Sequence, residues 1–181
     1  MKQHRGFTFI ELLIVLAIMS IVLVAIPNLY TQQSIETLRA AASEVRLTLE
    51  EAQTRAQSNA VASQCTGDEF TKYTNFLGTQ VVFFEAGGEH SVNIEGSCTN
   101  GDFTYSSVPI TKNYKNITIT TPDVSEFNTW EVLFQKRSGL PTSTATICVH
   151  SSIGGLVHPY IKIEVQATGD VRQYDPTETC P

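Results

Sequence analysis

The sequence lacks the short motifs that mark common enzyme sites. No G-x-S-x-G sequence occurs, and the two glycine pairs, Gly87-Gly88 and Gly154-Gly155, are typical of turns rather than of phosphate-binding loops. His90, His150 and His158 lack the H-x-x-x-H spacing and the acidic neighbours of a metal site. We therefore expect no catalytic residue, no metal and no cofactor.

The sequence also lacks any C-x-x-C pair, which excludes a zinc knuckle and a thioredoxin-like redox motif. Its four cysteines lie far apart, at Cys65, Cys98, Cys148 and Cys180. An even number of cysteines, all on one side of an apolar segment, predicts two disulfides in an oxidising compartment.

Basic residues are scarce relative to acidic ones. Twelve lysines and arginines against 18 acids give a formal charge of −6 and a pI near 5.2. This balance disfavours bulk attraction to nucleic acid or to anionic lipid. Charged residues make up only 17% and apolar residues 41% of the chain, which indicates a globular body rather than a disordered one.

Charge is almost absent from Phe7–Ile26, where Glu11 is the one ionisable residue. Twenty helical residues span about 30 Å, the thickness of the hydrocarbon core of a bilayer. Lys2 and Arg5 precede the segment, so the N-terminus is expected in the cytoplasm and the chain after Pro27 outside it. A secretory signal fits less well, because the run is long and no Ala-x-Ala site follows. A simple membrane anchor remains an alternative.

The string from Arg5 to Leu13, RGFTFIELL, contains a carboxylate that costs roughly 2.5–3.5 kcal/mol at membrane depth. Glu11 therefore has a partner, or it reaches to the membrane interface. The string resembles the N-terminus of type IV prepilins and type II secretion pseudopilins, which have a short basic leader, Gly, Phe, Thr, two apolar residues and Glu. The similarity continues through Leu16.

The resemblance implies that a prepilin peptidase cleaves between Gly6 and Phe7 and methylates the new amine of Phe7. It also implies that Glu11 receives the charged N-terminus of a neighbouring subunit during assembly. The expected partners are thus other minor and major subunits, the peptidase, an inner-membrane assembly platform and membrane lipid. Loss of residues 1–6 would remove Lys2 and Arg5 and change the net charge to −8.

The segment after Pro27 predicts an amphipathic helix. Its apolar residues recur every three or four positions and form one stripe, at Ile35, Leu38, Ala42, Val45, Leu49, Ala52, Ala56 and Ala60. These side chains are too small for a coiled-coil seam, so burial against a sheet is favoured. Pro27 can kink the helix, which predicts one long rod with a flexible point.

Beyond Ser63 the apolar period changes from near 3.6 to 2. We predict strands near Val81–Glu85, Ile117–Thr121, Trp130–Gln135, Thr144–His150, Tyr160–Gln166 and Asp170–Tyr174. The last two form a hairpin around Thr168-Gly169-Asp170, and long loops are expected over Cys65–Gly78 and Gly87–Asn116. The predicted fold is α+β: a long N-terminal helix packed on an antiparallel sheet.

The predicted regions are a leader at 1–6, a membrane and assembly helix at 7–26, an amphipathic helix at 27–63 and a β-rich exported part at 64–181. The cysteines permit three connectivities. We favour Cys65 with Cys98, which closes the loop after the helix, and Cys148 with Cys180, which pins the C-terminal tail to a central strand.

Within the pilin superfamily the exported part looks most like minor subunits of the general-secretion H and fimbrial T/U type. The similarity lies in three stretches: Glu51–Asn59 leading to Cys65, Val132–Phe134 followed by Ser138–Pro141 and Thr146–Val149, and the end of the hairpin at Thr168–Arg172. It implies a minor subunit at or near the tip of a type IV pilus or type II secretion pseudopilus.

A basic patch is a weaker candidate site. Lys136 and Arg137 could gather into a small basic patch with Lys162 and Arg172, which lie on later predicted strands. Related fimbrial T-type subunits are thought to bind DNA through a basic C-terminal turn, but here that turn contains Asp170. We favour a solvated strand face and expect no DNA binding, with a DNA-uptake subunit as the alternative.

Overall fold

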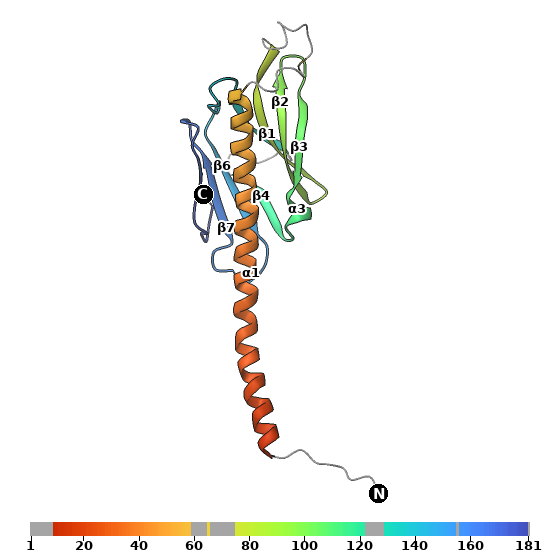
Figure 1. Cartoon of the computed structure of the whole chain (residues 1–181), viewed down its shortest axis with the longest axis vertical. Coiled ribbons are helices and arrows are strands. Elements are labelled where there is room, and N and C mark those ends of the chain that lie inside the picture. The colour runs from red at the N-terminus through yellow and green to blue at the C-terminus, as the bar shows by residue number, and fades with distance from the viewer. Residues whose placement is uncertain (1–8, 59–64, 66–74, 122–128, 155, 181) are drawn as a thin grey trace.

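The computed structural model describes residues 9–58, 65, 75–121, 129–154 and 156–180. It begins with one helix, α1 (Phe9–Ser58), whose 50 residues extend about 75 Å at the usual rise. The helix continues through Pro27 without a break, as the single rod predicted from the sequence requires. Figure 1 shows its N-terminal half protruding from the body and its C-terminal half lying along the strands.

Two antiparallel sheets form the body. The first has the strand order β3-β2-β1-β5 and the second β4-β6-β7-β8. The strands are β1 (Phe76–Ala86), β2 (Glu89–Cys98), β3 (Phe103–Pro109), β4 (Ile117–Thr120), β5 (Thr129–Gln135), β6 (Ala145–Ser151), β7 (Tyr160–Val165) and β8 (Val171–Gln173). A short helix, α3 (Ile110–Asn113), follows β3. The α+β fold class is confirmed, but the single sheet expected from the sequence is two sheets.

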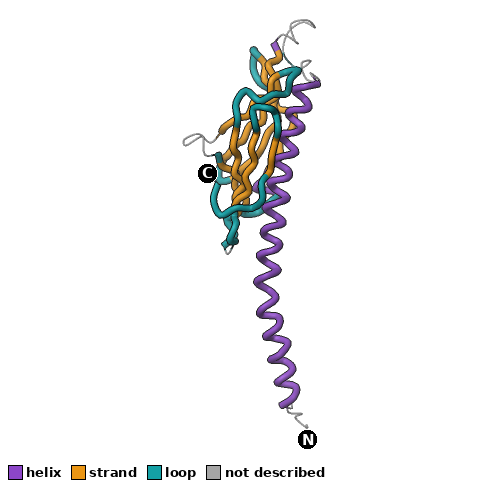
Figure 2. The backbone as a smooth tube through the Cα atoms, turned by 90° about the vertical axis from the view of Figure 1, so that its left-hand side faces the viewer, coloured by secondary structure: helices purple, strands orange, loops and turns teal. Residues whose placement is uncertain are grey.

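The core lies between α1 and the two sheets. The helix packs against β1, β2 and β5 of one sheet and β6, β7 and β8 of the other. Figure 2 shows the strands on one side of α1. The predicted stripe is buried, with complete burial of Leu38, Ala42, Val45, Leu49, Ala52 and Ala56. Ile35 is half-buried, and Ala60 lies outside the described residues.

Alanines on the buried stripe bring the helix backbone close to the sheets. Alternate residues of each strand then face it, as the period of 2 predicts. These are Val81 and Phe83 of β1, Val92 and Ile94 of β2, and Val132 and Phe134 of β5 in the first sheet, and Ile147, Val149, Ile161 and Ile163 in the second. The stacked rings of Phe83 and Trp130, 3.7 Å apart, extend this core across β1 and β5.

The long loop expected over Gly87–Asn116 is wrong, because this segment contains β2, β3 and α3. Strand β2 alternates buried and half-buried positions, yet its only large apolar residues are Val92 and Ile94. Its remaining buried positions carry small or polar side chains, which hid the strand from a search for apolar alternation. The loop expected over Cys65–Gly78 falls mostly outside the described residues, although its last three residues belong to β1.

Candidate functional site

The N-terminal half of α1 exposes a large apolar surface. Between Phe9 and Leu23 the described large apolar side chains are 44–77% exposed. They include Phe9, Ile10, Leu12, Leu13, Ile14, Val15, Leu16, Ile18, Met19, Ile21, Val22 and Leu23. A surface of this extent marks a contact with protein or lipid rather than with water.

Glu11 lies in the first turn of the described helix, among these apolar side chains, and it is exposed in the single chain. Gly6 and Phe7, the residues of the expected cleavage site, lie outside the described residues. Within the part of the chain that the structure describes, no helix contains a stretch both long and apolar enough to cross a membrane. The membrane segment expected at 7–26 begins outside that part, and the side chains of 24–26 are outside it as well.

The C-terminal end of α1 is held by polar contacts that the sequence analysis missed. Gln53 donates from Nε2 to the carbonyl of Gly169 at 3.0 Å, and the Arg137 backbone N–H donates to the carbonyl of Ala56 at 2.9 Å. The second bond satisfies one of the carbonyls that a helix end leaves without a partner. Gly139 is also close, since a Cβ there would lie 2.5 Å from the Gln57 side chain. Only the folded turns reveal these partners.

The cations of the expected basic patch occupy two different places. Lys136 and Arg137 lie in the turn after β5, beside the end of α1, where backbone N–H groups bond them to Leu77 and Ala56. Lys162 lies on β7 and Arg172 on β8, next to the C-terminal tail. The structure therefore places Lys162 near Arg172. Lys136 and Arg137 lie apart from this pair, in the turn after β5.

Carboxylates neutralise both strand cations. Lys162 Nζ lies 2.7 Å from Glu164, and Arg172 lies 3.2 Å from Asp170. Hydrogen bonds donated by Lys162 and by Tyr174 hold the pKa of the Glu164 carboxyl below its ordinary value. The first bond raises the pKa of Lys162, and the second raises the pKa of Tyr174. Each cation of this cluster is thus paired with a carboxylate, so the cluster does not form a cationic surface.

The histidines do not converge on a metal site. Among the described residues, no three His, Cys, Asp or Glu side chains come together in a way that could hold an ion. His150 instead stacks on Tyr160 with the ring centres 4.5 Å apart, and its Nδ1 lies 3.3 Å from the Thr118 hydroxyl. Burial lowers its pKa below the ordinary value. The ring thus forms part of the packing on the outer side of β4, β6 and β7.

Two disulfides join Cys65 to Cys98 and Cys148 to Cys180. These are the pairs favoured on the sequence. The first joins residue 65, which follows α1 in the chain, to the end of β2, in a small cluster with Phe76. The second ties the C-terminal tail to β6, and an open hollow of about 340 Å³ lies beside it. Three threonines, Tyr160, Glu178 and the disulfide itself line this hollow.

Comparison with known proteins adds two findings. Residues 1–27 match the family described as the prokaryotic N-terminal methylation motif. The fold is similar to the crystal structure of the type IV minor pilin FimU from Pseudomonas aeruginosa, with a TM-score of 0.50 and 13% identity. That similarity covers 79% of this chain and 96% of FimU. Comparison with curated protein sequences gave no match.

The chain thus carries the prokaryotic N-terminal methylation motif and has a fold similar to that of a type IV minor pilin. At 13% identity the likeness to FimU concerns the fold, while the motif concerns the N-terminus. The two findings are independent of each other, and both involve α1. The motif includes the N-terminal part of this helix, and the β-rich body packs against its C-terminal part. Among the described residues, the exposed apolar half of α1 is therefore the strongest candidate for the functional element.

Proposed function

We propose that the chain is a minor pilin or pseudopilin that assembles through α1 into a type IV pilus or a type II secretion pseudopilus. The observation that carries the proposal is the division of one helix into two halves. Between Leu38 and Ala56 one face of the helix is buried against the sheets, whereas the large apolar side chains from Phe9 to Leu23, within the methylation motif, are not covered by the described part of the chain. Neighbouring helices in a filament supply that cover.

Before assembly the same apolar half anchors the chain in the inner membrane. In the proposed topology residues 1–6 are cytoplasmic, 7–26 cross the bilayer once, and the β-rich part from residue 64 is periplasmic. Prepilin peptidase cleaves between Gly6 and Phe7 and methylates the amine of Phe7. An inner-membrane assembly platform then moves the subunit from lipid into the filament.

Glu11 accounts for the register of assembly. Among apolar side chains, a carboxylate beside an amine is stabilised by a charge-assisted hydrogen bond. The methylated N-terminus of a neighbouring subunit supplies that amine. A subunit therefore enters the filament where its Glu11 meets the N-terminus of another.

A place at or near the tip belongs to the proposal and rests on the resemblance to minor subunits. DNA uptake is not favoured, because Lys162 and Arg172 are both paired with carboxylates. Gene neighbourhood distinguishes a pilus from a secretion pseudopilus, since the two systems encode different partner proteins.

Processing is the direct test. The peptidase must approach the backbone beside Phe7, where Gly6 offers no side chain, so Gly6→Val is expected to leave the uncleaved precursor in the membrane. Mass spectrometry of the N-terminus measures this, with Gln3→Ala as a matched change that leaves cleavage intact. A methylated Phe7 N-terminus in the Gly6→Val variant would contradict the proposal.

A further inference from the structure

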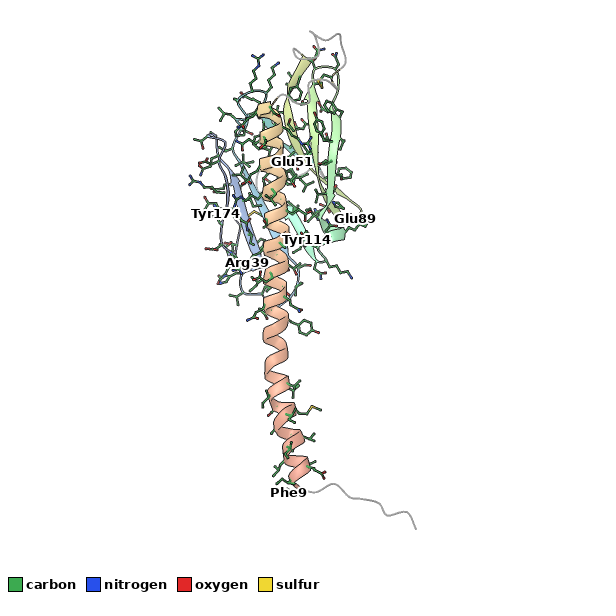
Figure 3. All side chains as sticks on the ribbon, in the orientation of Figure 1. Phe9, Arg39, Glu51, Glu89, Tyr114 and Tyr174 are labelled. Carbon is green, nitrogen blue, oxygen red and sulfur yellow. A yellow bond between two sulfur atoms is a disulfide. The ribbon has the colours of Figure 1, made fainter. Side chains whose placement is uncertain are left out.

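The direction of β7 decides which loops face the exposed half of α1. The Gln53 side chain, near the C-terminal end of the helix, donates to the carbonyl of Gly169, which follows β7. Ile161, at the start of β7, instead lines a hollow together with Arg39, much nearer the N-terminus of the helix. Figure 3 labels Arg39 near the lower end of the body, well below Glu51. The loop that joins β6 to β7 is therefore at the end of the body beside the protruding part of α1 (Figure 1).

This loop is apolar at its exposed part and uncharged throughout. Between Ser151, the last residue of β6, and Tyr160, the first of β7, the sequence contains no Asp, Glu, Lys or Arg. Val157 is 69% exposed, the largest exposed fraction among the large apolar side chains of the described body. Leu156 beside it is half-buried. Such a loop can leave water at little cost, because it has no charge to desolvate.

Tyr30 marks the same level on α1. It precedes Ser34 and Leu38 by one and two helical turns, so it continues the buried stripe of the helix towards the N-terminus. Ser34 is 7% and Leu38 is 0% exposed, whereas Tyr30 is 68% exposed because the sheets end above it. Tyrosine is enriched where a membrane meets water, since its ring is apolar and its hydroxyl group can stay hydrated.

The proposed membrane segment sets the height of both features. Tyr30 lies about 6 Å beyond Ile26 along the helix, and Arg39 lies about 20 Å beyond it. Val157 precedes Ile161 by four residues, so it can lie up to about 13 Å closer to the membrane than the level of Arg39. It then reaches to roughly 7 Å above Ile26, and a tilt of α1 towards the loop brings it closer. The headgroup layer on each side of a bilayer is about 5–7 Å thick.

We propose that Leu156 and Val157 insert into the headgroup region of the inner membrane, at the level of Tyr30, before the subunit enters a filament. We call Leu156 and Val157 the membrane-facing surface. This surface lies next to the membrane segment and carries no charge, which favours a lipid bilayer over a protein or nucleic-acid partner.

The contact rests on the proposed function, in which residues 7–26 cross the bilayer. It adds a lipid contact made by the body to the one made by the helix. With α1 and the membrane-facing surface both in the bilayer, the body is held at one tilt and rotation over the membrane. A subunit then presents a constant face to its partners before assembly.

Fluorescence quenching by brominated lipid tests the contact. The full chain with His158→Cys is labelled on the new thiol with the environment-sensitive dye NBD and reconstituted in phosphatidylcholine vesicles. All four native cysteines form disulfides, so the new thiol is the single free one. The lipid carries bromine either near the headgroup or near the end of the acyl chain. Bromine near the headgroup is expected to quench the dye, and to quench it more than the deeper bromine does.

A second label position is the matched control. Ser143 is exposed and precedes the start of β6, whereas His158 follows the end of that strand. The dye on Ser143→Cys is therefore held at the opposite end of the body, and neither lipid should quench it. Equal quenching at positions 143 and 158 would overturn the contact, because it would mean that the body touches lipid without a preferred end.

Variants of the His158→Cys chain test the two apolar side chains. Leu156→Ser combined with Val157→Ser is expected to lower the quenching by headgroup bromine about threefold, since less apolar area enters the interface. Leu140→Ser changes a leucine that is 41% exposed beside the C-terminal end of α1, and it should leave the quenching unchanged. Quenching that is the same in both variants would contradict the proposed role of Leu156 and Val157.

A label at Met19→Cys reports the proposed function separately. Met19 lies within the proposed membrane segment, so the deeper bromine is expected to quench its dye. Absence of this quenching overturns the membrane segment and the proposed function with it. Quenching at position 19 without quenching at position 158 overturns only the contact of the body with lipid. A shift of the dye at position 158 to shorter wavelength without quenching overturns it as well, because protein then covers the surface.

Discussion

At the scale of single residues, Gly78 shows how closely two strands approach at the start of β1. A Cβ at this position would lie 2.0 Å from the carbonyl oxygen of Phe134 on β5, far inside contact distance. The obstacle is backbone, which cannot move aside as a flexible side chain does. Gly139 differs, because its obstacle is the end of the Gln57 side chain, although its φ of 64° also favours glycine.

Gly78→Ala is therefore expected to lower the free energy of unfolding by about 1–3 kcal/mol, the usual range for overpacking. Gly154→Ala is the matched control, since a Cβ there meets nothing within 4 Å and the change should stay within about 0.5 kcal/mol. Urea unfolding measures both. Equal stability of the two variants would show that β1 and β5 separate at this point.

Glu11 is the residue on which the proposed assembly depends. Glu11→Ala should spare the fold of the body and favour membrane insertion, while lowering incorporation into filaments roughly tenfold or more. The estimate follows from the loss of a charge-assisted hydrogen bond of about 1.5–3 kcal/mol. Quantitative immunoblots of sheared filaments measure it, with Glu36→Ala, an exposed position on the same helix, as the control. Wild-type incorporation of Glu11→Ala would exclude the proposed role.

At the scale of elements, the strands with regular apolar alternation were predictable and the others were not. Strand β7 and its hairpin to β8 followed from Ile161, Ile163 and Val165, and Gly169 takes the positive φ, 90°, that the turn needs. Strands β2 and β3 were not predicted from the sequence. Residues with hydroxyl groups, His90 and Gly96 occupy positions where a strand pattern usually has large apolar residues. Their pairing with β1, rather than their own composition, makes them strands.

His150 gives the second sheet a dependence on pH. Burial places its pKa in the folded chain below the ordinary value of about 6.5. Between these two values the unfolded chain binds more protons than the folded chain, so the free energy of unfolding rises with pH across that window. We expect stability to fall as the pH drops below about 6.5.

Urea unfolding at several pH values tests this, and His150→Gln should flatten the dependence below about pH 6.5. His158→Gln changes an exposed histidine and should leave the dependence as it is. An unchanged slope in His150→Gln would assign the pH dependence to other groups.

The disulfide between Cys148 and Cys180 fixes the C-terminal tail across the second sheet. Replacing both cysteines by alanine should lower the free energy of unfolding by roughly 3–4 kcal/mol on the chain-entropy estimate. The Cys65–Cys98 pair spans 33 residues against 32, so its removal should cost a similar amount. Denaturant unfolding of the two double variants checks both values. If replacing Cys148 and Cys180 lowers the free energy of unfolding by much less than 1 kcal/mol, the C-terminal tail stays packed on the sheet without the disulfide.

At the scale of the whole molecule, charge and shape separate the functions that remain. The body is acidic, and the cations on β7 and β8 are paired, so no surface of the described part gathers the several free cations that phosphate binding needs. The described N-terminal half of α1 instead exposes apolar side chains and protrudes from the body (Figure 1). This arrangement suits packing between subunits.

We accordingly expect the fragment starting near Asn28 to bind duplex DNA with a Kd weaker than about 100 μM at physiological salt, the loose end of nonspecific binding. Fluorescence anisotropy with a labelled duplex measures this, and Lys162→Ala with Arg172→Ala should change it little. Low-micromolar binding that disappears in the double variant would instead support a role in DNA uptake.

The sequence by itself determined the N-terminal motif, the long helix, its buried stripe and the α+β class. These depend on local period and on a short string around Glu11, both of which can be read along one chain. The tertiary structure decided the division into two sheets, the identity of β2 and β3, and the separation of Lys136 and Arg137 from Lys162 and Arg172. It also decided the contacts of Gln53 and Arg137 at the helix end. These features join residues up to 116 positions apart, and such pairing depends on how the whole chain packs rather than on any one segment.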